Sequence, residues 1–171
     1  MSLLPIIILP DPALRLVSTP VERFDDEIKR LAADMLETMY KAPGIGLAAI
    51  QVNVPKRLLV LDVSDEEEGE AKKPIVMINP KILRLGDVSA VYEEGCLSLP
   101  DVRIDIERPT TVTVAYQDLD GRPVELETGG LLATAIQHEV DHLDGKLIID
   151  FLTRLKRDMV IRRFKKQARI G

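Results

Sequence analysis

Residues 137–145 read QHEVDHLDG, which contains the pattern H-E-x-x-H between positions 138 and 142. Apolar residues recur before and within this stretch at helical spacing, which predicts a helix over residues 130–143. Residues four apart lie on one face of a helix, so His138 and His142 can bind one metal ion. Glu139 lies roughly 100° further round the helix, where its carboxylate can act as a general base on a water at the metal. The pattern therefore predicts a helix that carries a metal site.

The supply of further metal ligands is small. The 171 residues include one Cys and two His, which excludes an intrachain disulfide and a zinc site built from cysteines alone. No Glu follows Glu139 and no His follows His142, so the downstream third ligand of many metallopeptidases is absent. We expect Cys96 as the third ligand, because the charges around it and the histidine pair favour ligation over burial as a small apolar residue. The downstream carboxylates that also remain possible are Asp144, Asp150 and Asp158.

Three protein ligands leave one position of a tetrahedral ion open to water, which is typical of a catalytic site and not of a structural one. A water on such an ion has a pKa of about 7, so it can lose a proton near neutral pH. Glu139 is the expected acceptor of that proton.

Length and composition favour a single globular domain. Apolar residues make up 46% and charged residues 30%, and the net charge of -5 argues against nucleic acid as an obvious partner. The apolar N-terminal run is too short to span a bilayer, prolines interrupt it and no basic residue precedes it, so it is a poor signal peptide. We expect one catalytic domain over residues 1–171, in a monomeric cytoplasmic protein that does not bind membranes.

The remaining pattern predicts an α+β fold with mainly antiparallel sheets packed around the helix that carries H-E-x-x-H. Helices are expected over residues 25–41, 130–143 and 153–168, with Asp25 or Asp26 capping the first and Thr128 the second. Residues 6–9 are expected to be a short buried strand or an extended segment, and residues 64–73 a charged surface loop. Strands are expected over residues 58–63, 75–78, 88–93, 102–106, 110–116 and 124–126. The last two of these are expected to form a hairpin.

Three motifs occur in order along the chain: GIGLAAIQ at residues 44–51, EGCLS at residues 94–98 and QHEVDHLDG at residues 137–145. In these motifs the chain closely resembles the peptide deformylase family of the bacterial type, whose patterns are G-x-G-L-A-A-x-Q, E-G-C-L-S and Q-H-E-x-D-H-L-x-G. The opening PDPALR at residues 10–15 is also similar to the beginning of that family, so the resemblance covers nearly the whole chain.

The resemblance implies an enzyme that removes the formyl group from the N-formyl-methionine of nascent polypeptides and releases formate. It implies that Cys96, His138 and His142 hold the metal. Glu139 would serve first as general base, when a metal-bound hydroxide attacks the formyl carbonyl, and then as general acid.

The same resemblance assigns the residues that would bind the substrate. The side-chain amide of Gln51 and the backbone N–H of Leu97 would stabilise the oxyanion, a role that is typically worth about 2.7–4 kcal/mol per donor. Gly44 and Gly46 would let an extended peptide approach as an added strand, although Gly44 can also simply end the first helix. Arg103 matches an arginine near the substrate backbone, with an ordinary surface arginine as the alternative. The other residues placed at the substrate are Ile45, Tyr92, Glu94, Gly95, Leu131 and Ala135.

Ferrous iron is the metal that the resemblance implies in the cell, and zinc, nickel or cobalt can occupy the same site. A set of one Cys and two His suits all of these ions, so the sequence does not choose among them. If iron is bound, oxygen is expected to inactivate the enzyme by oxidising the metal or Cys96.

The last 19 residues are strongly basic. Eight basic residues and the single acid Asp158 give residues 153–171 a charge of +7, whereas residues 1–152 carry 15 basic and 27 acidic residues, or -12. Leu155, Met159 and Phe164 are expected to form a partial apolar face. Such asymmetry suggests docking of this helix on ribosomal RNA, and the alternative is a solvated surface helix.

Two other functions stay open at this point. One is a zinc metallopeptidase that cleaves peptide bonds, and the other is a metal-binding, ribosome-associated protein without activity. The retained Glu139 argues against the second, because a structural metal site needs no general base.

Overall fold

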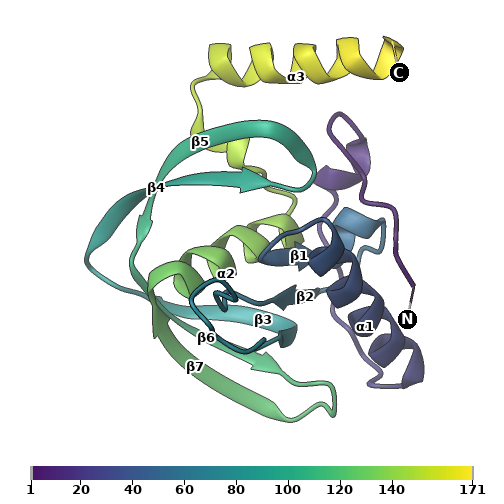
Figure 1. The fold of residues 1–171 in the computed structure, drawn as a ribbon, viewed down its shortest axis with the longest axis vertical. Helices are drawn as coiled ribbons and strands as arrows, with labels where there is room; N and C mark the ends of the chain where they lie inside the picture. The colour runs from purple at the N-terminus through teal and green to yellow at the C-terminus, as the bar shows by residue number, and fades with distance from the viewer. Residues whose placement is uncertain (1, 171) are drawn as a thin grey trace.

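Helix α2 (Gly130–Leu143) runs through the middle of the fold, at the place in the chain that the H-E-x-x-H stretch predicts. It lies between a five-stranded sheet and a two-stranded ribbon (Figure 1). Ten of its 14 residues are buried, because both layers pack against it. The computed structural model describes residues 2–170, so Met1 and Gly171, the two ends of the predicted domain, lie outside the described residues. The predicted α+β arrangement around a central helix is confirmed.

The larger sheet is antiparallel throughout. Its strands follow the order β1 (Gly46–Ala48), β2 (Leu58–Leu61), β3 (Ile75–Leu85), β6 (Thr111–Gln117) and β7 (Pro123–Gly129). In β2, Leu59 and Leu61 belong to the core cluster under α2, whereas Leu58 and Val60 belong to the cluster on the opposite face. This strand reads as a continuous apolar run because it is covered on both faces.

Helix α1 (Asp26–Lys41) covers that opposite face of the sheet. Asp25 caps it, since its Oδ1 accepts a hydrogen bond from the backbone N–H of Ile28 at 3.2 Å. Ile28, Ala32 and Met35 form the buried stripe that the helical spacing predicts. After β1, the short helix η2 (Ala49–Val52) turns the chain toward β2.

The ribbon consists of β4 (Ser89–Cys96) and β5 (Leu99–Pro109), which pair antiparallel. Alternate residues of β5 point inward, namely Val102, Ile104, Ile106 and Arg108. Val102, Ile104 and Ile106 pack in a third core cluster with residues of η1 (Pro12–Arg15), η3 (Ile148–Phe151) and α3 (Arg154–Ile170).

Helix α3 lies on the outer side of the ribbon, away from α2 (Figure 1). Phe164 is 3% exposed and packs in the core with the partly buried Val160 and Ile161, whereas Leu155 and Met159 are 71% and 60% exposed. The prediction that these three side chains share one face is wrong. At 100° per residue, Phe164 lies about 180° from Leu155 around the helix.

Several predicted boundaries also change. Strand β3 continues to Leu85 past a register shift that follows Ile78, where Asn79 has a φ of 53° and Pro80 interrupts the pattern. Helix α2 has Gly129 at its N-cap, not Thr128, because Thr128 is paired with Val112 within β7. The expected strand is absent from residues 6–9, where Leu9 begins a turn and is the one buried residue. Residues 64–73 form the predicted surface loop.

Within residues 2–170, no helix combines the length and the apolar character that crossing a membrane requires.

Candidate metal centre

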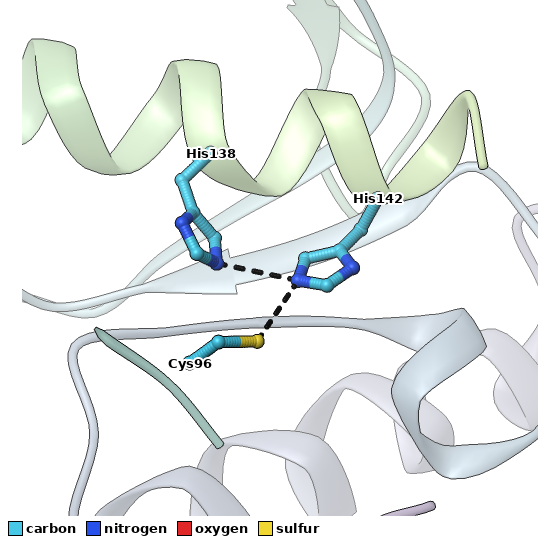
Figure 2. Close-up of side chains that lie close together, drawn as sticks. All are labelled: Cys96, His138 and His142. Atoms are coloured by element: carbon cyan, nitrogen blue, oxygen red, sulfur yellow. Dashed lines mark hydrogen bonds between the residues drawn. The ribbon is translucent and has the colours of Figure 1, made fainter. Parts of the chain in front are cut away.

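Three side chains from two distant segments meet beneath α2. The Nε2 atoms of His138 and His142 are 3.2 Å apart, and Cys96 Sγ is 3.3 Å from His142 Nε2. Figure 2 shows both imidazoles pointing from one face of the helix toward the sulfur. The three donor atoms all lie within 4.8 Å of one another, as the helical spacing of the histidines predicts for one shared ion.

The donor geometry fits a divalent cation. Metal–donor bonds of about 2.0–2.3 Å in a tetrahedral site separate neighbouring donor atoms by roughly 3.3–3.6 Å. The two short separations in this group are close to that range. When two imidazole nitrogens face each other, a proton or a cation must lie between them, because two lone pairs would otherwise repel. One sulfur with two imidazoles suits iron, zinc, nickel and cobalt.

A charged network contacts Nδ1 of His138, the ring nitrogen on the side away from Cys96 and His142 (Figure 2). Glu94 Oε1 is 3.1 Å from His138 Nδ1, and both Glu94 oxygens accept hydrogen bonds from Arg108, at 2.6 and 3.0 Å. Arg108 also donates to Asp141 at 3.0 Å, and the ring of Phe151 lies 4.8 Å from its guanidinium carbon. Burial alone would raise the pKa of Glu94, but hydrogen bonds with His138 and Arg108 hold it below its ordinary value. An ionised Glu94 fixes the proton of His138 on Nδ1 and leaves Nε2 free to bind a metal.

The pKa values of the two histidines are shifted in opposite directions. Burial alone would lower the pKa of His138, but the charge of Glu139 and hydrogen bonds to Cys96 and Glu94 raise it well above the ordinary value. Burial and the neighbouring charge of His138 lower the pKa of His142 well below that value. The surroundings therefore favour a positive charge at this position, which either a proton or a bound cation can supply.

Glu139 is buried beside the three donors and is not one of them. Its Oε2 is 3.9 Å from His138 Nε2, and its Oε1 has no hydrogen-bond partner within residues 2–170. Burial raises the pKa of Glu139 to about 7, partly opposed by the charge of His138. Gly46 makes room for this carboxylate, because a Cβ at position 46 would come within 2.5 Å of Oε2.

The Gln51 side chain lies on the other side of the group. Its Oε1 accepts a hydrogen bond from the backbone N–H of Ala48 at 2.9 Å, and its Nε2 donates to Ser98 Oγ at 3.0 Å. The same Nε2 is 3.7 Å from Cys96 Sγ. Leu97, between Cys96 and Ser98, lines the same cleft, so the two predicted oxyanion residues lie near the metal-binding group.

A cleft of about 780 Å³ opens beside this centre. Arg103 lies over Gly95, since a Cβ at position 95 would be 3.2 Å from the Arg103 guanidinium carbon. Gly44 lies just beyond Ala42, the C-cap of α1, and donates its N–H to Met39 O at 2.8 Å; it also lines the cleft. The predicted substrate residues that line the cleft are Gly44, Ile45, Gly46, Tyr92, Glu94, Gly95, Arg103, Leu131 and Ala135.

The alternative carboxylate ligands are placed elsewhere. Asp144 pairs with Arg57 at 3.0 Å, and Asp150 pairs with Arg15 at 2.7 Å. Asp158 lies on α3, on the outer side of the ribbon. Cys96 is therefore the residue that completes the group with the two histidines.

Three residues of this centre were not singled out from the sequence, namely Arg108, Asp141 and Ser98. A signal for Arg108 was present, because the period-two pattern of β5 places it on the inward face with Val102, Ile104 and Ile106. A buried arginine requires acidic partners, which would have led to Glu94 and Asp141. Nothing local in the sequence marks the contact of Ser98 with Gln51.

Comparison with known proteins decides the family. The family model for polypeptide deformylase matches residues 3–158, nearly the whole chain. The chain belongs to this family. A peptide deformylase of Rhizobium meliloti is 62% identical over 169 residues, which are 99% of this chain and 96% of that protein.

Solved peptide deformylases have the same fold. The crystal structure of peptide deformylase from Ehrlichia chaffeensis has a TM-score of 0.92 and 40% identity, covering 99% of this chain and 98% of that one. Its complex with actinonin gives a TM-score of 0.91 and 42% identity, covering 98% of both chains. Peptide deformylases are metal-dependent hydrolases that remove the formyl group of nascent peptides, and the chain has this activity.

Proposed function

We propose that deformylation takes place in the cleft beside α2, with one divalent ion held by Cys96, His138 and His142. The observation that carries this proposal is the convergence of three donor atoms beside a buried carboxylate that is not one of them. A divalent ion supplies Lewis acidity toward a carbonyl oxygen and lowers the pKa of a coordinated water. We propose ferrous iron as the ion in the cell, with zinc, nickel or cobalt able to take its place.

Glu139 is the group that moves protons. It accepts a proton from the attacking water and later delivers it to the amine nitrogen as the bond between that nitrogen and the formyl carbon breaks. The products are formate and a free α-amino group, so no proton is gained or lost by the enzyme over the cycle. Glu139 is buried and its pKa of about 7 is close to neutral pH, which supports both the accepting and the donating role.

Gln51 and Leu97 stabilise the negative charge that develops on the formyl oxygen. The fixed orientation of the Gln51 amide supports this role, because Ala48 holds its oxygen and leaves its nitrogen directed toward Ser98 and Cys96. A neutral amide donates without titrating, so this contribution is constant with pH.

The peptide binds along β1. This strand pairs with β2 on one side, and its flanking residues Gly44 and Ile45 line the cleft together with Gly46. An extended peptide can therefore add as a further strand with its backbone hydrogen-bonded to this edge. Ile45, Tyr92, Leu131 and other lining residues then surround the methionine side chain, with Arg103 near the peptide backbone.

Helix α3 docks the enzyme on ribosomal RNA in the cytoplasm. Seven of its eight basic residues are exposed, and only Phe164 of the helix is fully buried. A row of exposed cations on a surface element suits electrostatic binding to phosphates.

Substrate comparison tests the activity. Formate release from a formyl-Met peptide is compared with cleavage of the same peptide without its formyl group. We expect turnover of the formylated peptide alone, and cleavage of internal peptide bonds would indicate a peptidase instead. Cys96→Ala is expected to lose the metal, and one equivalent of metal retained by that variant would contradict the proposed ligand set.

A further inference from the structure

Ser98 has a buried hydroxyl that the proposed reaction does not use. Its side chain is fully buried, and its Oγ accepts a hydrogen bond from Gln51 Nε2 at 3.0 Å. It follows Cys96 by two residues, at the point where the ribbon turns from β4 into β5. Burying a hydroxyl without a hydrogen bond costs free energy. The bond from Gln51 Nε2 removes that cost for Ser98 and at the same time occupies one hydrogen of the Gln51 amide.

The orientation of the Gln51 amide is set at its oxygen. Ala48 offers a buried backbone N–H at 2.9 Å, and only the Oε1 atom of Gln51 can accept it. A flipped amide would direct its NH₂ group at this N–H, so two donors would face each other. Nε2 is therefore directed toward Ser98 and Cys96.

The nitrogen end has two hydrogens, and Ser98 takes one of them. The second is left for Cys96 Sγ, which lines the cleft and is a weak partner at 3.7 Å. With the oxygen held by Ala48 and one hydrogen by Ser98, the plane of the amide is fixed, and the second hydrogen has only the weak contact with Cys96 Sγ to exchange for a stronger acceptor. An oxyanion donor contributes most when its direction is fixed before the reaction.

The backbones of the same two residues are also tied together. In the N-terminal arm (residues 6–9), the N–H of Ile7 donates to Gln51 O at 2.8 Å and the N–H of Leu9 donates to Ser98 O at 3.0 Å. The arm thus bridges η2 and the turn between β4 and β5, and it holds the two side chains at a constant separation.

We infer that Ser98 is a positioning residue for the reaction and acts through the Gln51 amide. This inference rests on the proposed role of Gln51 as an oxyanion donor. Ser98 is not one of the three metal-binding residues, and its side chain is buried and is not among the residues that line the cleft. Its contribution is to keep one hydrogen of Gln51 directed at the formyl oxygen.

The test is a double-mutant cycle of Ser98→Ala and Gln51→Ala on the metal-loaded full-length enzyme, with kcat, KM, metal content and thermal unfolding measured for each variant. Ser98→Ala is expected to lower kcat about fivefold to tenfold, with KM and metal content unchanged. Gln51→Ala is expected to lower kcat by about 10²-fold or more. In the Gln51→Ala background, Ser98→Ala is expected to have no further effect on kcat.

Ser18→Ala is the matched control. Ser18 is also buried, and its hydroxyl has no hydrogen-bond partner in the part of the chain that the structure describes. Its replacement is expected to leave kcat unchanged, so a loss specific to Ser98 is not a general effect of removing a buried hydroxyl.

The outcomes separate the two hypotheses. Unchanged kcat in Ser98→Ala, or an equal loss in both backgrounds, overturns the positioning role while the role of Gln51 stands. Full kcat in Gln51→Ala overturns both. A loss for Ser98→Ala that disappears in the Gln51→Ala background supports the inference.

Discussion

Gly46 lies directly against the carboxylate of Glu139, so closely that a Cβ at position 46 would come within 2.5 Å of Glu139 Oε2. The absence of a side chain at this position therefore makes room for the Glu139 carboxylate, and in the proposed binding mode it also makes room for an incoming peptide. Gly46 belongs to the edge strand β1 and Glu139 to α2, so the sheet and the helix together define where the carboxylate lies.

Gly46→Ala should displace the Glu139 carboxylate while leaving the three metal donors in place. We expect kcat to fall by about 10²-fold, the lower end of what a general acid–base contributes, with metal content unchanged. Gly129→Ala is the control, because its Cβ would meet no neighbour closer than 3.4 Å. A Gly46→Ala enzyme with full kcat would show that the carboxylate has freedom to move.

Arg108→Leu should weaken metal binding without touching a ligand. The substitution leaves Glu94 and Asp141 without their shared cation, so the acceptor for His138 Nδ1 is no longer held in position. We expect metal affinity to fall about 10–100-fold and the free energy of unfolding to fall by about 3–5 kcal/mol. Metal titration and urea unfolding measure the two effects.

Lys29→Leu is the control for this substitution. It breaks an exposed pair with Asp120 at 3.7 Å, which should cost about 1 kcal/mol or less and leave metal affinity unchanged. Equal metal affinity in Arg108→Leu and the native enzyme would refute the positioning role of the network.

Tyr40→Phe should destabilise the protein in a pH-dependent way. Buried Asp62 accepts hydrogen bonds from Tyr40 at 2.6 Å and from Ser64 and Lys73, at the two ends of the acidic loop. Burial alone would raise the pKa of Asp62, but the bonds from Ser64 and Tyr40 lower it below its ordinary value of 3.8. The stabilisation is therefore fully present above about pH 4 and is lost as the pH falls through the lowered pKa.

Urea unfolding at several pH values measures this effect. The difference between native enzyme and Tyr40→Phe should be about 1.5–3 kcal/mol at pH 7 and should shrink below pH 4. Tyr116→Phe is the control, because Tyr116 is also partly buried but is not one of the donors to Asp62. A difference that stays constant down to pH 3 would contradict the assignment of Asp62 as the acceptor.

Charge reversal on α3 should weaken ribosome binding selectively. Arg162→Glu with Lys166→Glu places two acids one helical turn apart on the exposed side, while Phe164 keeps its contact with the core. We expect weaker association, a shallower dependence of binding on salt, and unchanged turnover of small formyl peptides. Removing the whole helix after Leu152 is a poorer experiment, because it also removes buried Phe164.

Lys81→Glu with Arg84→Glu changes the net charge equally on an exposed part of β3 and serves as the control. If both pairs weaken ribosome binding to the same extent, net charge and not the helix explains the effect.

Much of the centre could be predicted because its information is local. The two histidines and Glu139 share one helix, and helical geometry alone brings them together. The approach of Cys96 depends on how the ribbon lies against α2, so spacing suggested it only by elimination, and the family resemblance then assigned it. The side-by-side placement of Gln51 and Ser98 depends on the N-terminal arm, and no local pattern encodes it.

The errors have equally specific causes. Thr128 reads as a helix cap, yet it is committed to the pairing of β7 with β6, so the helix begins without a side-chain cap. The predicted strand ends at Ile78, yet β3 continues past Pro80, which cannot donate a ladder hydrogen bond, because the register shifts there. Leu155, Met159 and Phe164 are all apolar, but their angles around α3 place Phe164 on the side opposite to Leu155.

The most direct test of the proposed centre is Glu139→Gln, assayed for both metal content and formate release from a formyl-Met peptide. The amide has nearly the same size as the carboxylate and cannot accept the proton of the attacking water. We predict one equivalent of metal per chain and a loss of at least about 10²-fold in kcat. A Glu139→Gln enzyme that holds its metal and releases formate at the native rate would contradict the role of Glu139 and with it the proposed reaction at this site.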